Sequence, residues 1–163
     1  MVVELYRLKD LDLSGDERQV FKKLLDKTVF EFAEKHIVLD KNAIVLNSDY
    51  ALKADITIGK YTSIINLQRE NNLNDVNEYI RVIYLLLKKG GKYLCCFEIR
   101  NNKLADEPEG ILDNILMKIK KRNGRYFSKE DICEFFKIFD MHLVAKKKIN
   151  NLTYMVFERR ESP

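Results

Sequence analysis

The chain has 163 residues, of which 46% are hydrophobic and 33% are charged, and its formal net charge at pH 7 is +4. This composition allows a buried core in a soluble protein, and the length favours a single domain over residues 1–163. No apolar run approaches the ~20 residues of a membrane-spanning helix, and Met1–Lys9 has no signal-peptide core. We therefore expect a cytoplasmic protein with no membrane partner.

The three cysteines indicate free thiols rather than a disulfide framework. Cys95 and Cys96 are adjacent on a predicted strand, where successive side chains point to opposite faces, so they cannot easily share one metal ion. Cys133 lies alone in a predicted helix. With two histidines and no cluster of ligands, we expect no structural metal.

The first 60 residues alternate predicted strands and helices, a pattern typical of a parallel sheet covered by helices. Ser14 and Glu17 have the spacing of a capping box and begin a helix that runs to about Asp26. The predicted strands of this half are Tyr6–Leu13, Thr28–Phe32, Ala43–Leu46 and Asp55–Ile58.

The segment Ala33–Lys41 is compatible with a short helix or an irregular crossover. A competing register makes His36–Leu39 the second strand. That register leaves few residues before Ala43, whereas parallel neighbours need a crossover of about a dozen residues. It therefore works only as a hairpin, and we prefer Thr28–Phe32 as the second strand.

The second half begins with a predicted helix, Val76–Leu87, whose apolar residues recur at helical spacing. Lys88 and Lys89 suit the negative end of the helix dipole, and Gly90 suits a left-handed cap. An apolar strand, Lys92–Phe97, follows directly after Gly91.

An insertion, Asn101–Gly124, separates this strand from the final elements. It contains an amphipathic helix, Ile111–Lys121, which we expect to cover the sheet. Alternatively, the insertion holds substrate or a second subunit. A capped helix, Ser128–Phe139, comes next. The chain closes with two strands, His142–Ile149 and Leu152–Arg159, joined by an Asn150-Asn151 turn.

This order of elements resembles a class I S-adenosylmethionine (SAM)-dependent methyltransferase, and the resemblance covers about Tyr6 to Arg160. It implies a Rossmann-like α/β sheet, mostly parallel with an antiparallel C-terminal β-hairpin, and helices on both faces. It also implies SAM as the cofactor and methyl transfer as the activity.

In that family, the first strand leads into a glycine-rich loop that cradles SAM. The matching residues here are Asp12, Ser14 and Gly15. The family usually has two or three glycines, which let the backbone approach the ligand, and this loop has only Gly15. Exposed N–H groups at the following helix start could still bind the methionine carboxylate. Alternatively, Ser14 only caps the helix.

The resemblance also implies an acidic residue that binds the ribose hydroxyls after strand two. Glu34 is the nearest match, Glu31 is next, and Asp40 fits only the alternative register. Asp49, after the predicted strand Ala43–Leu46, matches the residue that binds the adenine amine. The alternative for Asp49 is a side chain that stabilises a local turn.

The acceptor substrate is expected at the carboxyl end of the predicted strand Asp55–Ile58, because ligands of open parallel sheets bind there. Gly59 is expected to contact the cofactor, and Lys60 or Tyr61 to position or deprotonate the nucleophile. Methyl transfer is a direct displacement, so it needs no metal and no covalent enzyme intermediate.

The positive charge is concentrated in the second half of the chain. Residues 1–87 carry 12 Lys and Arg against 14 Asp and Glu, whereas residues 88–163 carry 17 against 11. An anionic acceptor, with nucleic acid as the first choice, is one explanation, and solvated surface charge is the other. The alternative function is a methyltransferase-like binding or partner subunit that has lost catalysis.

Overall fold

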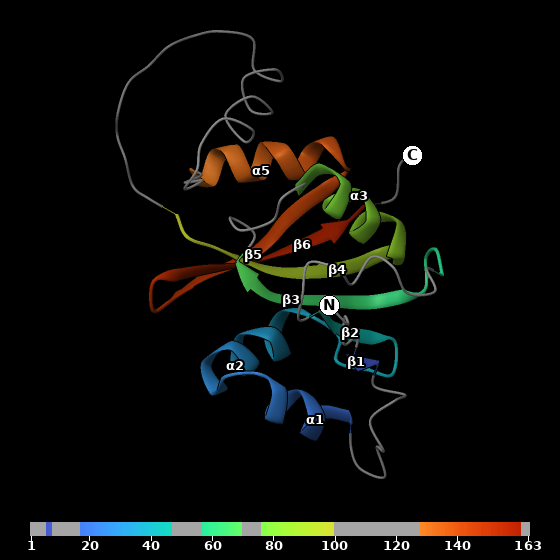
Figure 1. Ribbon diagram of the computed structural model, residues 1–163, viewed down its shortest axis with the longest axis vertical. Coiled ribbons are helices and arrows are strands. Elements are labelled where there is room, and N and C mark those ends of the chain that lie inside the picture. Colours follow the sequence, from blue (N-terminus) through green and yellow to red (C-terminus); the bar gives the residue numbers. More distant parts are fainter. Residues whose placement is uncertain (1–5, 8–16, 47–56, 70–75, 100–127, 161–163) are drawn as a thin grey trace, which may run out of the picture.

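The described residues form one six-stranded sheet with helices on both sides (Figure 1). The predicted helix Ile111–Lys121 lies outside the described residues. The computed structural model describes residues 6–7, 17–46, 57–69, 76–99 and 128–160.

The sheet has the strand order β1-β2-β3-β4-β6-β5. The strands β2, β3, β4 and β5 run in one direction, and β1 and β6 run in the other. The expected mostly parallel sheet with an antiparallel C-terminal hairpin is therefore confirmed. The bounds are β1 Tyr6–Arg7, β2 Ala43–Leu46, β3 Tyr61–Arg69, β4 Leu87–Phe97, β5 Met141–Ile149 and β6 Leu152–Arg159.

Two of the described helices cover each face of the sheet, so the predicted helices on both faces are confirmed (Figure 1). Side chains of β4 alternate between the faces, as the pleat requires: Tyr93 and Cys95 join one core, and Leu94 joins the other. The helices α3 (Val76–Leu86) and α5 (Lys129–Ile138) cover the first core, and α1 (Glu17–Leu24) and α2 (Lys27–His36) cover the second.

Aromatic rings fix α5 over the centre of the sheet. Phe136 stacks on Phe157 of β6 with ring centroids 3.8 Å apart, and it meets Phe97 of β4 edge to face at 6.3 Å. Such pairs contribute about 0.5–1.5 kcal/mol each beyond their buried area. The predicted capping box is also present, because Ser128 and Asp131 exchange hydrogen bonds of 3.1 and 3.2 Å.

The segment Thr28–Phe32 is part of α2, so its prediction as a strand is wrong. Val29 and Ala33 are both buried, at the i, i+4 spacing of a helix face. Asp26 caps this helix by accepting a hydrogen bond of 2.9 Å from the backbone N–H of Thr28. The competing strand His36–Leu39 is also absent, because α2 ends at His36 and no strand begins between His36 and Ala43.

The predicted strand Asp55–Ile58 is wrong over its described residues, since Ile58 and Gly59 form a turn. The strand β3 begins three residues after Ile58, at Tyr61, and the sequence analysis did not predict it. Its centre, Ile64 and Ile65, is buried on both faces, as expected for an inner parallel strand.

The Gly90-Gly91 pair makes the tight connection from α3 to the paired part of β4. Gly90 has a φ of +70°, which agrees with the predicted left-handed residue. A Cβ atom on Gly91 would lie 2.7 Å from the backbone oxygen of Lys88 and 3.0 Å from that of Tyr61. The first glycine therefore supplies a backbone angle and the second supplies space.

Candidate functional site at the carboxyl edge of the sheet

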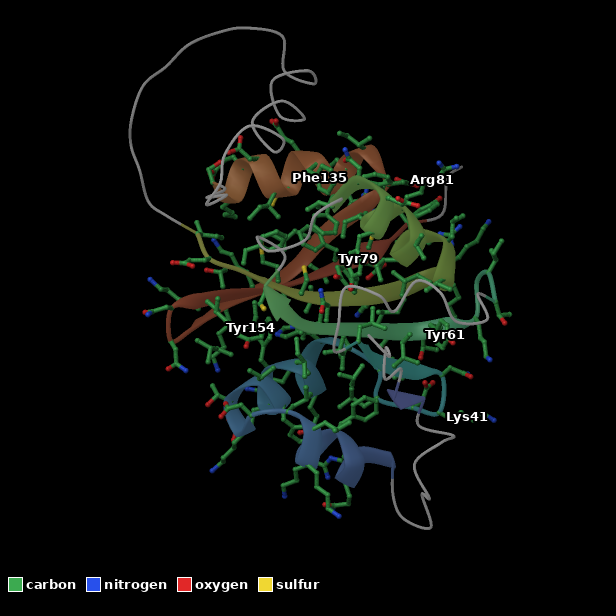
Figure 2. All side chains as sticks on the ribbon, in the orientation of Figure 1. Lys41, Tyr61, Tyr79, Arg81, Phe135 and Tyr154 are labelled. Atoms are coloured by element: carbon green, nitrogen blue, oxygen red, sulfur yellow. The ribbon has the colours of Figure 1, made fainter. Side chains whose placement is uncertain are left out.

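The parallel strands define two edges of the sheet. At the amino edge β2, β3 and β4 begin, with Ala43, Tyr61 and Leu87, and at the carboxyl edge they end. Figure 2 shows Tyr61 at one end of the sheet and Tyr154 at the other. Ligands of open α/β sheets bind outside the carboxyl ends of the strands, so the candidate site lies at the carboxyl edge.

Lys60 and Tyr61, the predicted catalytic pair, lie at the amino edge. Lys60 directly precedes β3 and Tyr61 is its first residue, so the placement predicted for them, after a strand, is wrong. Gly59, the predicted cofactor residue beside them, has a φ of +66° and donates its N–H to the Leu85 carbonyl at 2.8 Å. This hydrogen bond links the turn before β3 to the end of α3.

Asp40, one alternative for the ribose, also belongs to the amino edge. Its Oδ1 accepts hydrogen bonds from the Asn42 N–H at 2.9 Å and from the Thr62 hydroxyl at 2.6 Å. The Thr62 side chain is only 6% exposed. Asp40 therefore ties the turn before β2 to the start of β3.

Glu34 and Glu31 lie on α2, not after a strand, so the placement predicted for them is wrong. Glu34 forms an ion pair with Arg18 of α1 on the surface. The last turn of α2 lies at the amino edge, because the Lys92 ammonium donates a 3.0 Å hydrogen bond to the His36 carbonyl.

Arg159 donates to backbone carbonyls at the end of α3, as Lys92 does at the end of α2. Its guanidinium donates to the carbonyls of Tyr84 and Leu87, at 2.8 and 2.5 Å, and lies 4.0 Å from the centre of the Tyr84 ring. Basic side chains stabilise helix C-termini by satisfying free carbonyls and complementing the helix dipole. The cations Lys92 and Arg159 thus serve the fold at the amino edge.

The described residues at the carboxyl edge include Asn66, Glu98 and Ile99. Asn66 is 2% exposed and lies opposite Leu46, the last residue of β2. Glu98 is half-buried and directly follows β4. Asn66 was not predicted because β3 was not predicted, although the β-branched residues Thr62, Ile64 and Ile65 were a signal for a strand.

The other predicted cofactor residues, Asp12, Ser14, Gly15 and Asp49, lie outside the described residues. The described residues of the expected first strand, Tyr6 and Arg7, run antiparallel to β2, so this pair is not part of a parallel strand. In contrast, Asp49 follows Leu46 by three residues, and β2 ends at the carboxyl edge.

Tyr154, which packs against the second core, and Cys133, which packs against the first, both have raised pKa values. Burial raises the pKa of the Tyr154 hydroxyl, and the nearby Cys96 and Asp26 add to the effect. Burial also raises the pKa of the Cys133 thiol.

In the described part of the chain, no three His, Cys, Asp or Glu residues gather as a metal site. No helix described here is long and apolar enough to cross a membrane.

No protein-family model and no curated protein sequence matches the chain. Among solved structures, a Burkholderia thailandensis 1,6-didemethyltoxoflavin-N1-methyltransferase, with its substrate and S-adenosylhomocysteine bound, matches with a TM-score of 0.50 and 11% identity. The match covers 68% of this chain and 48% of the other, so the chain spans about half of that protein's length.

An O-methyltransferase family 2 protein from Planctomyces limnophilus, in complex with apigenin, matches with a TM-score of 0.46 and 18% identity, covering 66% of this chain and 32% of the other. That score is too low to add weight, so the fold assignment rests on the first match and on the parallel strands with their antiparallel C-terminal hairpin. The chain has the Rossmann-like fold of the class I SAM-dependent methyltransferases.

Proposed function

We propose that the protein binds SAM at the carboxyl edge of β2 and β3 and transfers its methyl group to an acceptor. The observation that carries this proposal is the exit of the chain from buried β2 at that edge, into Asn47-Ser48-Asp49. A carboxylate just after a buried parallel strand is suited to accept hydrogen bonds from an adenine amine or a ribose.

The described residues suggest how each part of such a site would act. Asn66 is buried beside the end of β2, where an amide can both donate to and accept from a polar ligand. Glu98 follows β4 at the same edge, and we assign it to the acceptor side, where a carboxylate can hold or remove a proton. The sulfonium of SAM supplies the activated methyl group, and alignment of the acceptor lowers the barrier.

Isothermal titration with S-adenosylhomocysteine tests this proposal. We expect micromolar binding by the wild type and at least about tenfold weaker binding by Asp49→Ala, equivalent to ~1.4 kcal/mol. Glu34→Ala is the matched control, because it removes a carboxylate from the surface of α2. Loss of binding in the Glu34 variant would restore its ribose role, and no binding by the wild type would refute the proposal.

A second candidate function is a methyltransferase-like partner subunit without cofactor. Rossmann-like sheets bind nucleotide cofactors where the strand order reverses. Among the described strands, the run β1-β2-β3-β4 follows the sequence without such a reversal. Only residues 47–60 connect β2 to β3. Under this function, neither SAM nor its product would raise the melting temperature at millimolar concentration, although the chain folds normally.

A further inference from the structure

The hairpin of β5 and β6 carries three consecutive exposed lysines, Lys146, Lys147 and Lys148, here called the lysine tip. Since β5 runs in the same direction as β4, the lysine tip lies at the carboxyl edge. Lys148 pairs with Thr153, which in turn pairs with Phe97 at the end of β4. Figure 1 shows the hairpin extending beyond the end of β3.

The charges of the lysine tip are not neutralised by the strand beside it. Its cross-strand partners are Met155, Tyr154 and Thr153, and none of them is acidic. A lysine within a sheet is usually stabilised by an opposite charge at that position. Among the described residues, no hydrogen bond or ion pair engages Lys147 or Lys148, in contrast to Lys92 and Arg159 at the amino edge.

A further lysine concentrates the positive charge. Lys129, at the start of α5, lies close to Lys146, and its positive charge lowers the pKa of Lys146. Two like charges held close together are relieved when an anion binds between them. The acidic residues Glu130 and Asp131 of the first turn of α5 directly follow Lys129 in the sequence. Of these, Asp131 is engaged in the capping box.

The alternation of the strand spreads the lysine tip over both faces of the hairpin. Lys147 points to the face opposite that of Lys146 and Lys148. Tyr154, half-buried, pairs with Lys147 and provides an aromatic ring at this end of the sheet (Figure 2). Lysines on both sides of a projecting hairpin, next to an aromatic ring, suit a ligand with repeated negative charges and flat bases.

We propose that the lysine tip binds the phosphate backbone of a nucleic acid strand. Neighbouring strands are about 4.8 Å apart, so β5 lies three spacings, about 14 Å, from β3 along the carboxyl edge. That distance corresponds to about four nucleotides at 3.4 Å each. Binding at the lysine tip needs no cofactor, whereas a role for the nucleic acid as methyl acceptor rests on the proposed function.

The test is fluorescence anisotropy of a labelled, mixed-sequence single-stranded RNA without SAM, from about 50 to 200 mM salt. The test variant combines Lys146→Gln, Lys147→Gln and Lys148→Gln. The matched control combines Lys41→Gln, Lys88→Gln and Lys89→Gln, three exposed lysines of the amino edge with the same total charge. Circular dichroism and the melting temperature establish that both variants fold.

We expect the test variant to bind RNA at least about tenfold more weakly at low salt, with the control changed by less than about threefold. Loss of three phosphate contacts should also reduce the slope of log affinity against log salt by about 2. Equal losses of RNA affinity in both variants would overturn the proposal. It would also be overturned if polyglutamate of equal charge competed with the labelled RNA as efficiently as unlabelled RNA does.

Edge-strand lysines also prevent pairing with other chains. A test variant that self-associates in sedimentation experiments while keeping its RNA affinity would assign the lysine tip to that role and overturn the proposal. Titration with S-adenosylhomocysteine is run in parallel on the same proteins. A wild type that binds RNA through the lysine tip but not this product supports the inference and refutes methyl transfer, so the two failures are distinguishable.

Discussion

The two edges of the sheet use polar side chains in different ways. At the amino edge, Asp40, Lys92 and Arg159 all bind backbone or side-chain groups of neighbouring elements. At the carboxyl edge, Lys147 and Lys148 make no such contact among the described residues, and Glu98 directly follows a strand. A charged side chain alone therefore does not indicate a binding site in this protein. Its role depends on which groups it contacts.

The comparison leads to opposite expectations for substitutions at the two edges. Variants of the amino edge should lower the free energy of unfolding and leave ligand binding unchanged. Variants such as Asp49→Ala should do the reverse. The following substitutions at the amino edge, ordered from the largest expected effect to the smallest, test this distinction.

The largest effect is expected for Gly91→Ala. The new Cβ atom would lie 2.7 and 3.0 Å from two backbone oxygens, so the α3–β4 connection must shift. We expect a loss of about 3 kcal/mol in the free energy of unfolding, measured with urea. Gly90→Ala is the control, since its Cβ meets nothing within 4 Å and only the positive φ costs about 1 kcal/mol. Equal losses for the two variants would contradict the steric explanation.

Arg159→Met should cost about 2 kcal/mol, because it leaves the carbonyls of Tyr84 and Leu87 without their charged donor while keeping the apolar stem. Arg159→Lys retains the charge but lacks the planar fork, and we expect an intermediate loss. Chemical denaturation measures both values. A loss below about 0.5 kcal/mol for the methionine variant would show that water satisfies these carbonyls equally well.

Asp40→Ala should cost about 1 kcal/mol, because the Asn42 N–H and the Thr62 hydroxyl lose their acceptor. Combination with Thr62→Val in a double-mutant cycle isolates the side-chain hydrogen bond. We expect a coupling of at least about 0.5 kcal/mol. Additive losses would indicate that the two residues act independently, against the proposed link between the β2 turn and β3.

The smallest effect is expected for Lys60→Ala, which should change the free energy of unfolding by less than about 0.5 kcal/mol. Binding of S-adenosylhomocysteine should also remain unchanged, since Lys60 precedes β3 at the amino edge. This substitution can break the comparison most directly. Loss of product binding in a normally folded Lys60→Ala protein would move the cofactor site to the amino edge.

Local sequence signals predicted the described part of the second half of the chain well. The Ser128–Asp131 capping box, the Gly90-Gly91 pair and the Asn150-Asn151 turn each fix backbone geometry within a few residues. The pattern of α2 did not suffice, because its β-branched and aromatic residues favour a strand locally and only packing against the sheet makes them helical. In the second half, cap and turn residues at the ends of the elements thus made those elements predictable.

The candidate site was harder to predict than the fold. A strand placed a few residues too early in the sequence turned the start of β3 into a strand end, which moved Lys60 and Tyr61 to the wrong edge. Asn66 was missed for the same reason. A site that depends on strand ends requires boundaries accurate to one or two residues, and sequence periodicity does not locate boundaries that well. Asp49 remains a prediction.

The position of β6 between β4 and β5 has a consequence for how the chain folds. Because β6 pairs with both neighbours, β4 and β5 have no partner on those sides until Leu152–Arg159 has been synthesised. Pairing of β4 with β6 joins segments more than fifty residues apart, and such distant contacts form slowly. A nascent chain that has not yet reached β6 therefore exposes one unpaired side of β4 and the whole of β5, the state in which a chaperone would be needed most.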